Sequence, residues 1–307
     1  MKKGRIFTNS LLSIWTMCLL AALASCSADS DNVTDYTGEP IVAEAPFSVI
    51  LKAYSENEDI TSRGDVKSTT LYVFDQNNDF YKQIVVDETY PLQAKPVQID
   101  CPGSDKITVV AWSGLSSSNA EISYMSEANI ISDLQISLKQ NNGVVNNFPE
   151  DLFYGQVTLK RNNTKATTAQ PLKISRKVAS LSLTTKGILK VYDSKEGSFF
   201  YKVKKTKSSI NYNGELTGND VEYIIPATLN EKGVLVAETT PILPASNISV
   251  ELYKNNELIF SGENLKNNEN VSVNEGEQVC ATFDVSKKSC DIIVSSWGTV
   301  IQRVVVE

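Results

Sequence analysis

The sequence predicts an all-β protein built from two β-sandwich domains in tandem. From Pro46 onward, short runs rich in β-branched and aromatic residues alternate with turn residues roughly every 8–12 positions, which is typical of a sandwich or a barrel. No run has the length and the helical period of a long helix. The chain has 307 residues, and at roughly 150 residues per domain this length suggests two domains.

In the first half of the chain, alternation of apolar and polar side chains marks the strands. The expected strands are residues 47–54, 71–75, 80–86, 106–112 and 134–138. Asn77-Asn78 suits a tight hairpin turn between the second and third of these, because asparagine tolerates a positive φ better than most residues. The last segment is ambiguous, since Ile130, Leu134 and Leu138 would also share one face of a helix; we predict the strand.

The second half repeats this pattern and adds a stronger turn signal. The expected strands are residues 178–185, 199–203, 210–212, 215–216, 248–253, 258–261, 280–285, 292–297 and 300–306. Asn213-Gly214 is a typical two-residue hairpin turn, and Asn255-Asn256 repeats the turn of the first half. The halves are expected to divide between Pro171 and Lys177, which gives an N-terminal domain over residues 46–175 and a C-terminal domain over 176–307.

Residues 1–25 have the layout of a bacterial secretion signal. A basic start precedes an apolar run over residues 11–23 that is too short for a lasting membrane span. Cys26 follows Leu-Ala-Ser, the pattern of a lipobox, where a signal peptidase cuts and the new N-terminal cysteine carries acyl chains. Stable anchoring in a membrane needs more than one acyl chain, and a multiply acylated cysteine meets that condition. Residues 26–45 are polar and acidic, as expected of a flexible tether.

The composition argues against several classes of function. The formal net charge is −7, and the densest basic run, residues 202–207, is interpreted as the solvated side of a strand, so no nucleic-acid partner is expected. The chain contains no histidine, which removes the commonest general base and the commonest transition-metal ligand. We therefore expect no catalytic site, no metal site and no cofactor.

Beyond residue 26, the cysteines are Cys101, Cys280 and Cys290. A bridge between Cys280 and Cys290 would suit an oxidising compartment. A turn over residues 286–289 would instead place Cys280 opposite residue 294 and Cys290 opposite Asp284, which keeps the two sulfurs apart. Partly buried thiols are favoured, and the disulfide state stays open.

Five short segments, in this order behind the lipobox, resemble a known family. They are Leu71-Tyr72-Val73-Phe74-Asp75, Val109-Val110-Ala111-Trp112, Asp151-Leu152-Phe153-Tyr154-Gly155, Ile174-Ser175-Arg176-Lys177-Val178-Ala179, and Ile292-Ile293-Val294-Ser295-Ser296-Trp297 before a valine-rich strand. Together they resemble the FimB-type anchor and accessory subunits of the fimbrillin family, which builds type V fimbriae. The resemblance covers residues 46–307, nearly all of the mature chain.

The resemblance implies two transthyretin-like Greek-key β-sandwiches on a lipoprotein of the outer membrane that is displayed outside the cell. In stalk subunits of the family, cleavage after an arginine frees a first strand and opens a groove, which a C-terminal strand of the next subunit fills. Anchor subunits keep their lipidated N-terminus and are not cut. The acidic residues Asp29 and Asp31 are similar to signals that send such lipoproteins to the cell surface.

Two segments are candidates for processing and assembly. Arg63 lies in the polar stretch 57–65, where a trypsin-like protease could cut an exposed loop, although an ordinary surface arginine is the alternative. Arg63-Gly64-Asp65 spells an integrin-binding tripeptide, which we take as chance. The proposed assembly strand is Val300, Ile301, Gln302, Arg303, Val304, Val305 and Val306. Such an apolar strand at a free chain end must be paired or kept for a partner; the alternative is that it completes the second domain's own sheet.

Two further residue sets have a simpler interpretation than a site. Trp112, Tyr154 and Trp297 could form a platform for sugar rings, but each follows an alternating strand, which favours the core. Glu150 and Asp151 form an acidic pair with no evident partner, so a solvated turn is the simpler interpretation.

The sequence thus predicts a surface lipoprotein subunit of fimbriae, an anchor or accessory component without enzymatic activity. It would assemble by β-strand addition and support adhesion. Its expected partners are other fimbrial subunits, the outer membrane through the lipid on Cys26, and a host ligand. The alternative is a surface glycan-binding lipoprotein that serves nutrient uptake.

Overall fold

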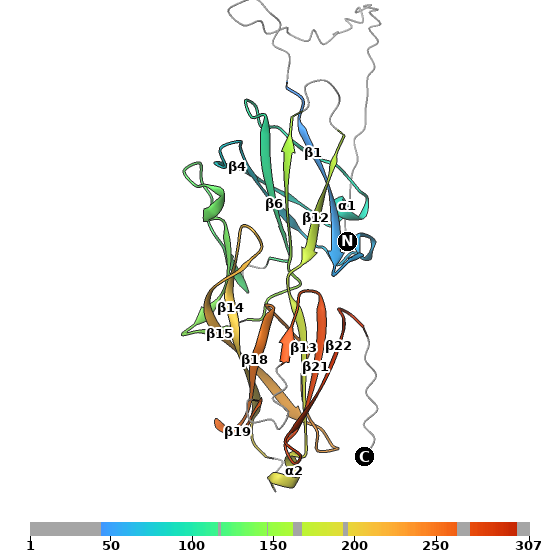
Figure 1. Cartoon of the computed structure of the whole chain (residues 1–307), viewed down its shortest axis with the longest axis vertical. Coiled ribbons are helices and arrows are strands. Elements are labelled where there is room, and N and C mark those ends of the chain that lie inside the picture. Colours follow the sequence, from blue (N-terminus) through green and yellow to red (C-terminus); the bar gives the residue numbers. More distant parts are fainter. Residues whose placement is uncertain are drawn as a thin grey trace, which may run out of the picture. The chain divides into compact units, whose positions relative to one another are not determined.

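The computed structural model describes residues 44–299, except 116–117, 146, 162–167, 193–195 and 263–270. The strands of this part form two sheets, one of 8 strands and one of 14 (Figure 1). The helical pieces are the α-helices α1 (Thr89–Leu92) and α2 (Ile188–Val191) and the 3₁₀ turns η1 (Thr61–Arg63) and η2 (Ile131–Asp133). Among the described residues, no helix is long and apolar enough to span a membrane. The predicted all-β, sandwich-type fold class is confirmed.

The first sheet has the strand order β2-β1-β12-β11-β6-β3-β4, and β5 pairs with β1. These strands are β1 (Phe47–Ser55), β2 (Glu58–Asp59), β3 (Thr69–Phe74), β4 (Phe80–Val86), β5 (Val97–Ile99), β6 (Lys106–Ser113), β11 (Phe153–Lys160) and β12 (Gln170–Arg176). β1 and β12 run parallel and their arrows point the same way in Figure 1, whereas the other pairs in this sheet are antiparallel. The predicted β3–β4 hairpin is confirmed, with Asn78 at φ 69° in its turn.

One face of the first sheet packs into its own apolar core. The alternating apolar residues of β1 are all buried in this core, as the sequence predicts, and they meet side chains from the neighbouring strands and from the segments around α1 and η1. Gly155 allows β11 to lie close to β12, because a Cβ at this position would be 2.0 Å from the carbonyl oxygen of Lys173. A larger side chain there would therefore push the two strands apart.

The second sheet has the main order β19-β18-β14-β15-β16-β13-β21-β22. These strands are β13 (Ala179–Lys186), β14 (Phe199–Asn211), β15 (Leu216–Leu229), β16 (Leu235–Ala237), β18 (Ala245–Lys254), β19 (Glu257–Ser261), β21 (Glu277–Asp284) and β22 (Ser289–Ser296), with β17 (Thr240–Ile242) and β20 (Val271–Val273) beside them. The long β14–β15 hairpin turns at the predicted Asn213-Gly214, where Gly214 has φ 75°. β13 and β21 are parallel, and β21 and β22 form the predicted late hairpin.

Four strands from the first half of the chain also belong to the second sheet. They are β7 (Ala120–Ile122), β8 (Gln135–Leu138), β9 (Gln140–Asn141) and β10 (Val144–Val145). β8 pairs with the end of β14, where Ile136 lies opposite Ile210, and Val144 of β10 pairs with Glu222 of β15. The predicted strand over 134–138 is thereby confirmed over the helix. The predicted domain boundary at 175/176 stays a prediction, and these hydrogen bonds cross it.

The β21–β22 hairpin fixes the positions of two cysteines. Cys280 lies opposite Ile293 and Cys290 opposite Phe283, one residue away from the register expected from the sequence. The difference arises because the turn occupies residues 285–288, where Lys288 takes a positive φ of 54°. Cys101 and Cys280 are buried free thiols.

Candidate functional site

Two of the predicted site elements lie outside the described residues. These are Cys26, the predicted lipidation site, and Val300–Val306, the predicted assembly strand. Both stay predictions. The structure does describe the segments from which each of them continues, Glu44 on the N-terminal side and Trp297 on the C-terminal side.

Arg63, the predicted cleavage site, is the last residue of η1. Its side chain is 43% exposed and pairs with Glu58. Its backbone N–H donates to the Ile60 carbonyl at 2.9 Å, and the Thr61 N–H donates to the Asp59 carboxylate, also at 2.9 Å. Hydrogen bonds from the hydroxyl and the N–H of Thr61 hold the pKa of Asp59 below its ordinary value. The side chain is therefore accessible, but its backbone is held in a turn.

The residues after Arg63 lead into a buried arginine cluster. Asp65 accepts a hydrogen bond from Nη2 of Arg176 at 3.0 Å, so its carboxylate is already paired. This pairing supports the interpretation of Arg63-Gly64-Asp65 as a chance tripeptide, since an integrin-type ligand would need a free carboxylate.

The side chain of Arg176 is only 1% exposed and is surrounded by partners. Nε and Nη2 donate to the two carboxylate oxygens of Asp151 at 2.6 and 2.7 Å, and Nη1 donates to Ser55 Oγ at 2.8 Å. The guanidinium lies 4.7 Å from the ring centre of Trp297 and 4.9 Å from that of Phe153. We call Ser55, Asp65, Asp151, Phe153, Arg176 and Trp297 the Arg176 cluster.

The strand order explains why these residues meet. Arg176 ends β12, which lies between β1 and β11, so Ser55 at the end of β1 and Phe153 at the start of β11 become its neighbours. Asp151 is thus not the solvated turn residue expected from the sequence: burial raises its pKa above the ordinary value, and the Arg176 guanidinium opposes that rise. The available sequence signal was a lone arginine at an apolar position of an alternating strand.

A polar cleft of about 630 Å³ opens beside the Arg176 cluster. Its charged lining side chains include Arg63, Lys67 and Glu150 beside the charged members of the cluster. Basic and acidic groups balance one another, and the carboxylates of Asp65 and Asp151 are already bound to Arg176. Across the described part of the chain, no cluster of acidic or cysteine side chains could hold a metal ion.

The aromatic residues considered for a sugar platform do not share a plane. Trp112 is buried in the core, where its ring centre lies 4.7 Å from that of Tyr154 at an angle of 51°. The Tyr154 hydroxyl donates to the Tyr212 carbonyl at 2.8 Å, and Trp297 stacks on Arg176. The core interpretation is confirmed for Trp112, and the other two side chains are half-buried.

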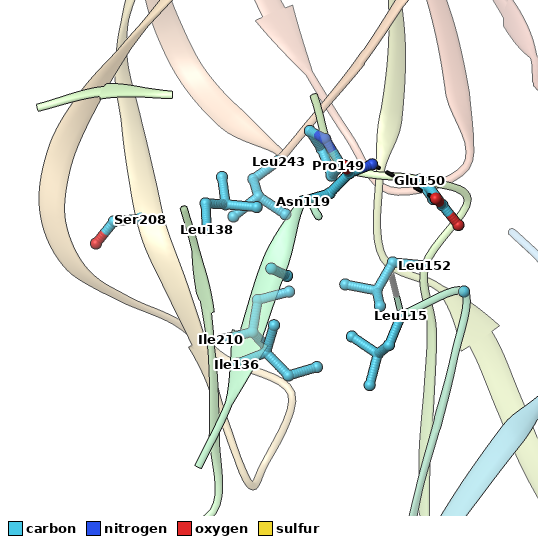
Figure 2. A pocket seen from close by; sticks show the side chains of 12 residues that line it. Leu115, Asn119, Ile136, Leu138, Pro149, Glu150, Leu152, Ser208, Ile210 and Leu243 are labelled. Carbon is cyan, nitrogen blue, oxygen red and sulfur yellow. Dashed lines mark hydrogen bonds between the residues drawn. The ribbon is translucent and has the colours of Figure 1, made fainter. Parts of the chain in front are cut away.

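A second, apolar pocket lies where β8 meets β14. Figure 2 shows Ile136 and Ile210 on one side of it and Leu115 and Leu152 on the other, with Asn119 bonded to Glu150 at its edge. Its cavity of about 10 Å³ holds at most one water molecule. This pocket is a small gap between packed apolar side chains rather than a ligand site.

Comparison with known proteins supplies the family. The model of the family described as "Fimbrillin-A associated anchor proteins Mfa1 and Mfa2" matches residues 37–303. The chain belongs to this family of fimbrial anchor proteins. The resemblance inferred from the five segments is confirmed, and the protein is a fimbrial subunit at the cell surface. No curated protein matches the sequence.

Solved structures similar to this fimbrial anchor family member share its fold across most of their length. A putative polysaccharide binding protein from Bacteroides thetaiotaomicron has a TM-score of 0.63 at 16% identity, covering 84% of this chain and 99% of that one. A putative adhesin from Bacteroides ovatus has a TM-score of 0.62 at 13% sequence identity, and the match covers 79% of this chain and 89% of that one. The fimbrial anchor protein Mfa2 from Porphyromonas gingivalis has a TM-score of 0.58 at 13% sequence identity, and the match covers 83% of this chain and 98% of that one.

Proposed function

We propose that this protein is the membrane anchor of a fimbrium, held in the outer membrane by acyl chains on Cys26. The observation that carries the proposal is the full integration of β1. One edge of β1 pairs with β12, and the other pairs with β5 and β2. A cut after Arg63 would remove this strand together with any lipid on the N-terminus. An anchor must keep both, and the folded turn at Arg63 favours their retention.

We further propose that Val300–Val306 joins this protein to the next subunit by strand addition. Trp297 gives that segment a fixed origin, because its N–H donates to the Gly276 carbonyl at 2.9 Å and its ring packs on Arg176. In strand addition, backbone hydrogen bonds supply the affinity and alternating side chains fix the register. The function is therefore structural and requires no catalytic group. The predicted host ligand is retained as a further partner.

The lipid anchor is tested by Cys26→Ala. We expect the variant to lose its partition into detergent in a phase-separation assay while keeping its fold, because the first described strand begins at Phe47, well after Cys26. Cys18→Ala, in the apolar run of the signal, is the matched control and should leave partition unchanged. A Cys26→Ala protein that still enters the detergent phase would show that another segment holds it in the membrane.

A further inference from the structure

We infer that the parallel pair β1–β12, with a buried arginine at each end of β1, is a mechanical clamp against tension along the fimbrium. This inference rests on the proposed function, in which the membrane holds the N-terminus and the next subunit pulls on the C-terminus. The chain enters the fold at β1, and after the excursion of β7–β10 it leaves the first sheet for the last time at the end of β12. Tension between the two chain ends therefore passes through this strand pair.

The parallel direction of the two strands decides how the tension acts. Residues Val49–Tyr54 pair in register with Gln170–Ser175, and the N-terminus of β1 lies at the opposite end of the pair from the C-terminus of β12. Pulling on these two points slides the strands along each other, so the evenly spaced hydrogen bonds of the pair are strained together. Pulling at two points on the same end would instead break the bonds one at a time. The first arrangement resists much more force.

Arg161, which directly follows β11, ties the residues before β1 to the segment after β5. Its side chain is 4% exposed, and Nη2 lies 3.0 Å from the Glu44 carboxylate and donates to the Cys101 carbonyl at 2.8 Å. The guanidinium also donates to the Ala45 carbonyl and lies 4.6 Å from the Phe47 ring centre. Glu44 in turn accepts the Gly103 N–H at 3.0 Å. Charge-assisted contacts of this kind are roughly twice as strong as neutral hydrogen bonds.

Arg176 fastens the opposite end. It is the last residue of β12, and its bond to Ser55 Oγ at 2.8 Å ties that strand to the last residue of β1. The next residue, Lys177, continues the connection: its N–H donates to the Leu152 carbonyl at 2.7 Å, and Nζ donates to Glu275 at 2.8 Å. Tension that reaches β12 is thus passed directly to the turn before β21.

The strand geometry is tested by single-molecule force spectroscopy on the mature chain with Cys26→Ser. One handle is fixed to the N-terminus. The second is attached either through Ser175→Cys near the end of β12 or through Thr168→Cys just before its start. We expect the force that separates β1 from β12 to be several-fold higher with the handle at 175, because only this geometry strains all the bonds together. Equal rupture forces in the two geometries would overturn the clamp.

The role of Arg161 is tested with the second handle at residue 175. Arg161→Gln should shorten the lifetime of the pair at constant force roughly tenfold, as expected for the loss of one charge-assisted contact, and Arg161→Lys should shorten it less. Val86→Ala, in the core of the same sheet but on the far edge strand β4, should lower resistance to urea and leave the lifetime unchanged. An unchanged lifetime in both Arg161 variants would remove the arginine from the clamp.

The two proposals fail independently. Membrane retention of Cys26→Ala would refute the lipid anchor but leave the rupture forces untouched. Equal rupture forces would refute the clamp whatever holds the protein in the membrane.

Discussion

Arg161 and Arg176 each turn a buried positive charge into a connection between segments far apart in sequence. Arg161 binds backbone carbonyls of Ala45 and Cys101, and Arg176 binds carboxylates of Asp65 and Asp151. Removing a buried charged group is costly because its partners stay behind without compensation. The two arginines therefore differ from the exposed Arg63 in their burial, and in the sequence only the apolar position of Arg176 in an alternating strand marks that difference.

Arg176→Gln is expected to lower the free energy of unfolding by about 2–4 kcal/mol, since Asp151 would keep a partly buried carboxylate without its counter-ion. Urea denaturation measures this change. Arg63→Gln is the matched control: its ion pair with Glu58 is exposed on both sides, so the change should stay within about 1 kcal/mol. Similar losses in the two variants would mean that the Arg176 cluster contributes no more than a surface pair.

At the scale of single elements, the turn η1 decides whether Arg63 can be cut. Asp59→Ala removes the carboxylate that accepts the Thr61 N–H, so we expect faster cleavage after Arg63 in limited trypsin proteolysis at neutral pH. Because its folded pKa is lowered from 3.8, Asp59 stabilises the turn above that value and loses this effect as the pH falls through the lowered pKa.

The control for the η1 experiment is Asp87→Ala, which removes a similar carboxylate bonded to Thr89 and should not alter cleavage at Arg63. The wild-type surface protein is expected to begin at residue 26 when its N-terminus is read by mass spectrometry. A chain that begins at Gly64 would contradict the anchor and favour a stalk subunit.

The terminal segment 300–307 is the second element with a testable role. Its deletion is expected to leave a folded protein that no longer joins other subunits, because each described strand already pairs with another strand within residues 44–299. Thermal melting reports folding, and co-purification with fimbrial subunits reports assembly. A deletion variant with a lowered melting temperature would instead support the alternative, in which the strand completes the second sheet. Val304→Asp, which changes one face only, is the milder variant for the same comparison.

Local patterns in the sequence predicted many of the strands, whereas β11, β12, most of β15 and the partners distant in sequence were missed. The alternation of 47–54 and 134–138 identified β1 and β8, because one face of each strand is buried, and Asn213-Gly214 identified its hairpin. The pairing of β8 with β14 and the contact of Asp151 with Arg176 had no local signal. Both depend on which strands become neighbours, and alternation within a strand does not specify its neighbour.

At the scale of the whole described fold, apolar packing joins the two sheets. The core of the second sheet also takes side chains from the opposite face of the first, including Tyr72, Val110 and Trp112. β8 adds Ile136 and Leu138 to the same core. The packing and the hydrogen bonds of β7–β10 therefore couple parts of the chain that the sequence assigned to separate domains. Such coupling suits a protein under tension, because neither part can open without exposing apolar surface of the other.

The fragment 176–307 tests this coupling. Expressed alone, it lacks β8 and β10, so Ile210 loses its cross-strand partner Ile136 and the end of β14 becomes an open edge. We expect a lower urea midpoint than that of the full chain and binding of a hydrophobic dye, because apolar core is exposed. Fusing residues 118–150 to the fragment through a flexible linker should restore the midpoint in part, whereas the same fusion with Ile136→Asp should not. A fragment as stable as the full chain would show that the C-terminal half folds independently, and it would uphold the boundary at 175/176 that the sequence predicts.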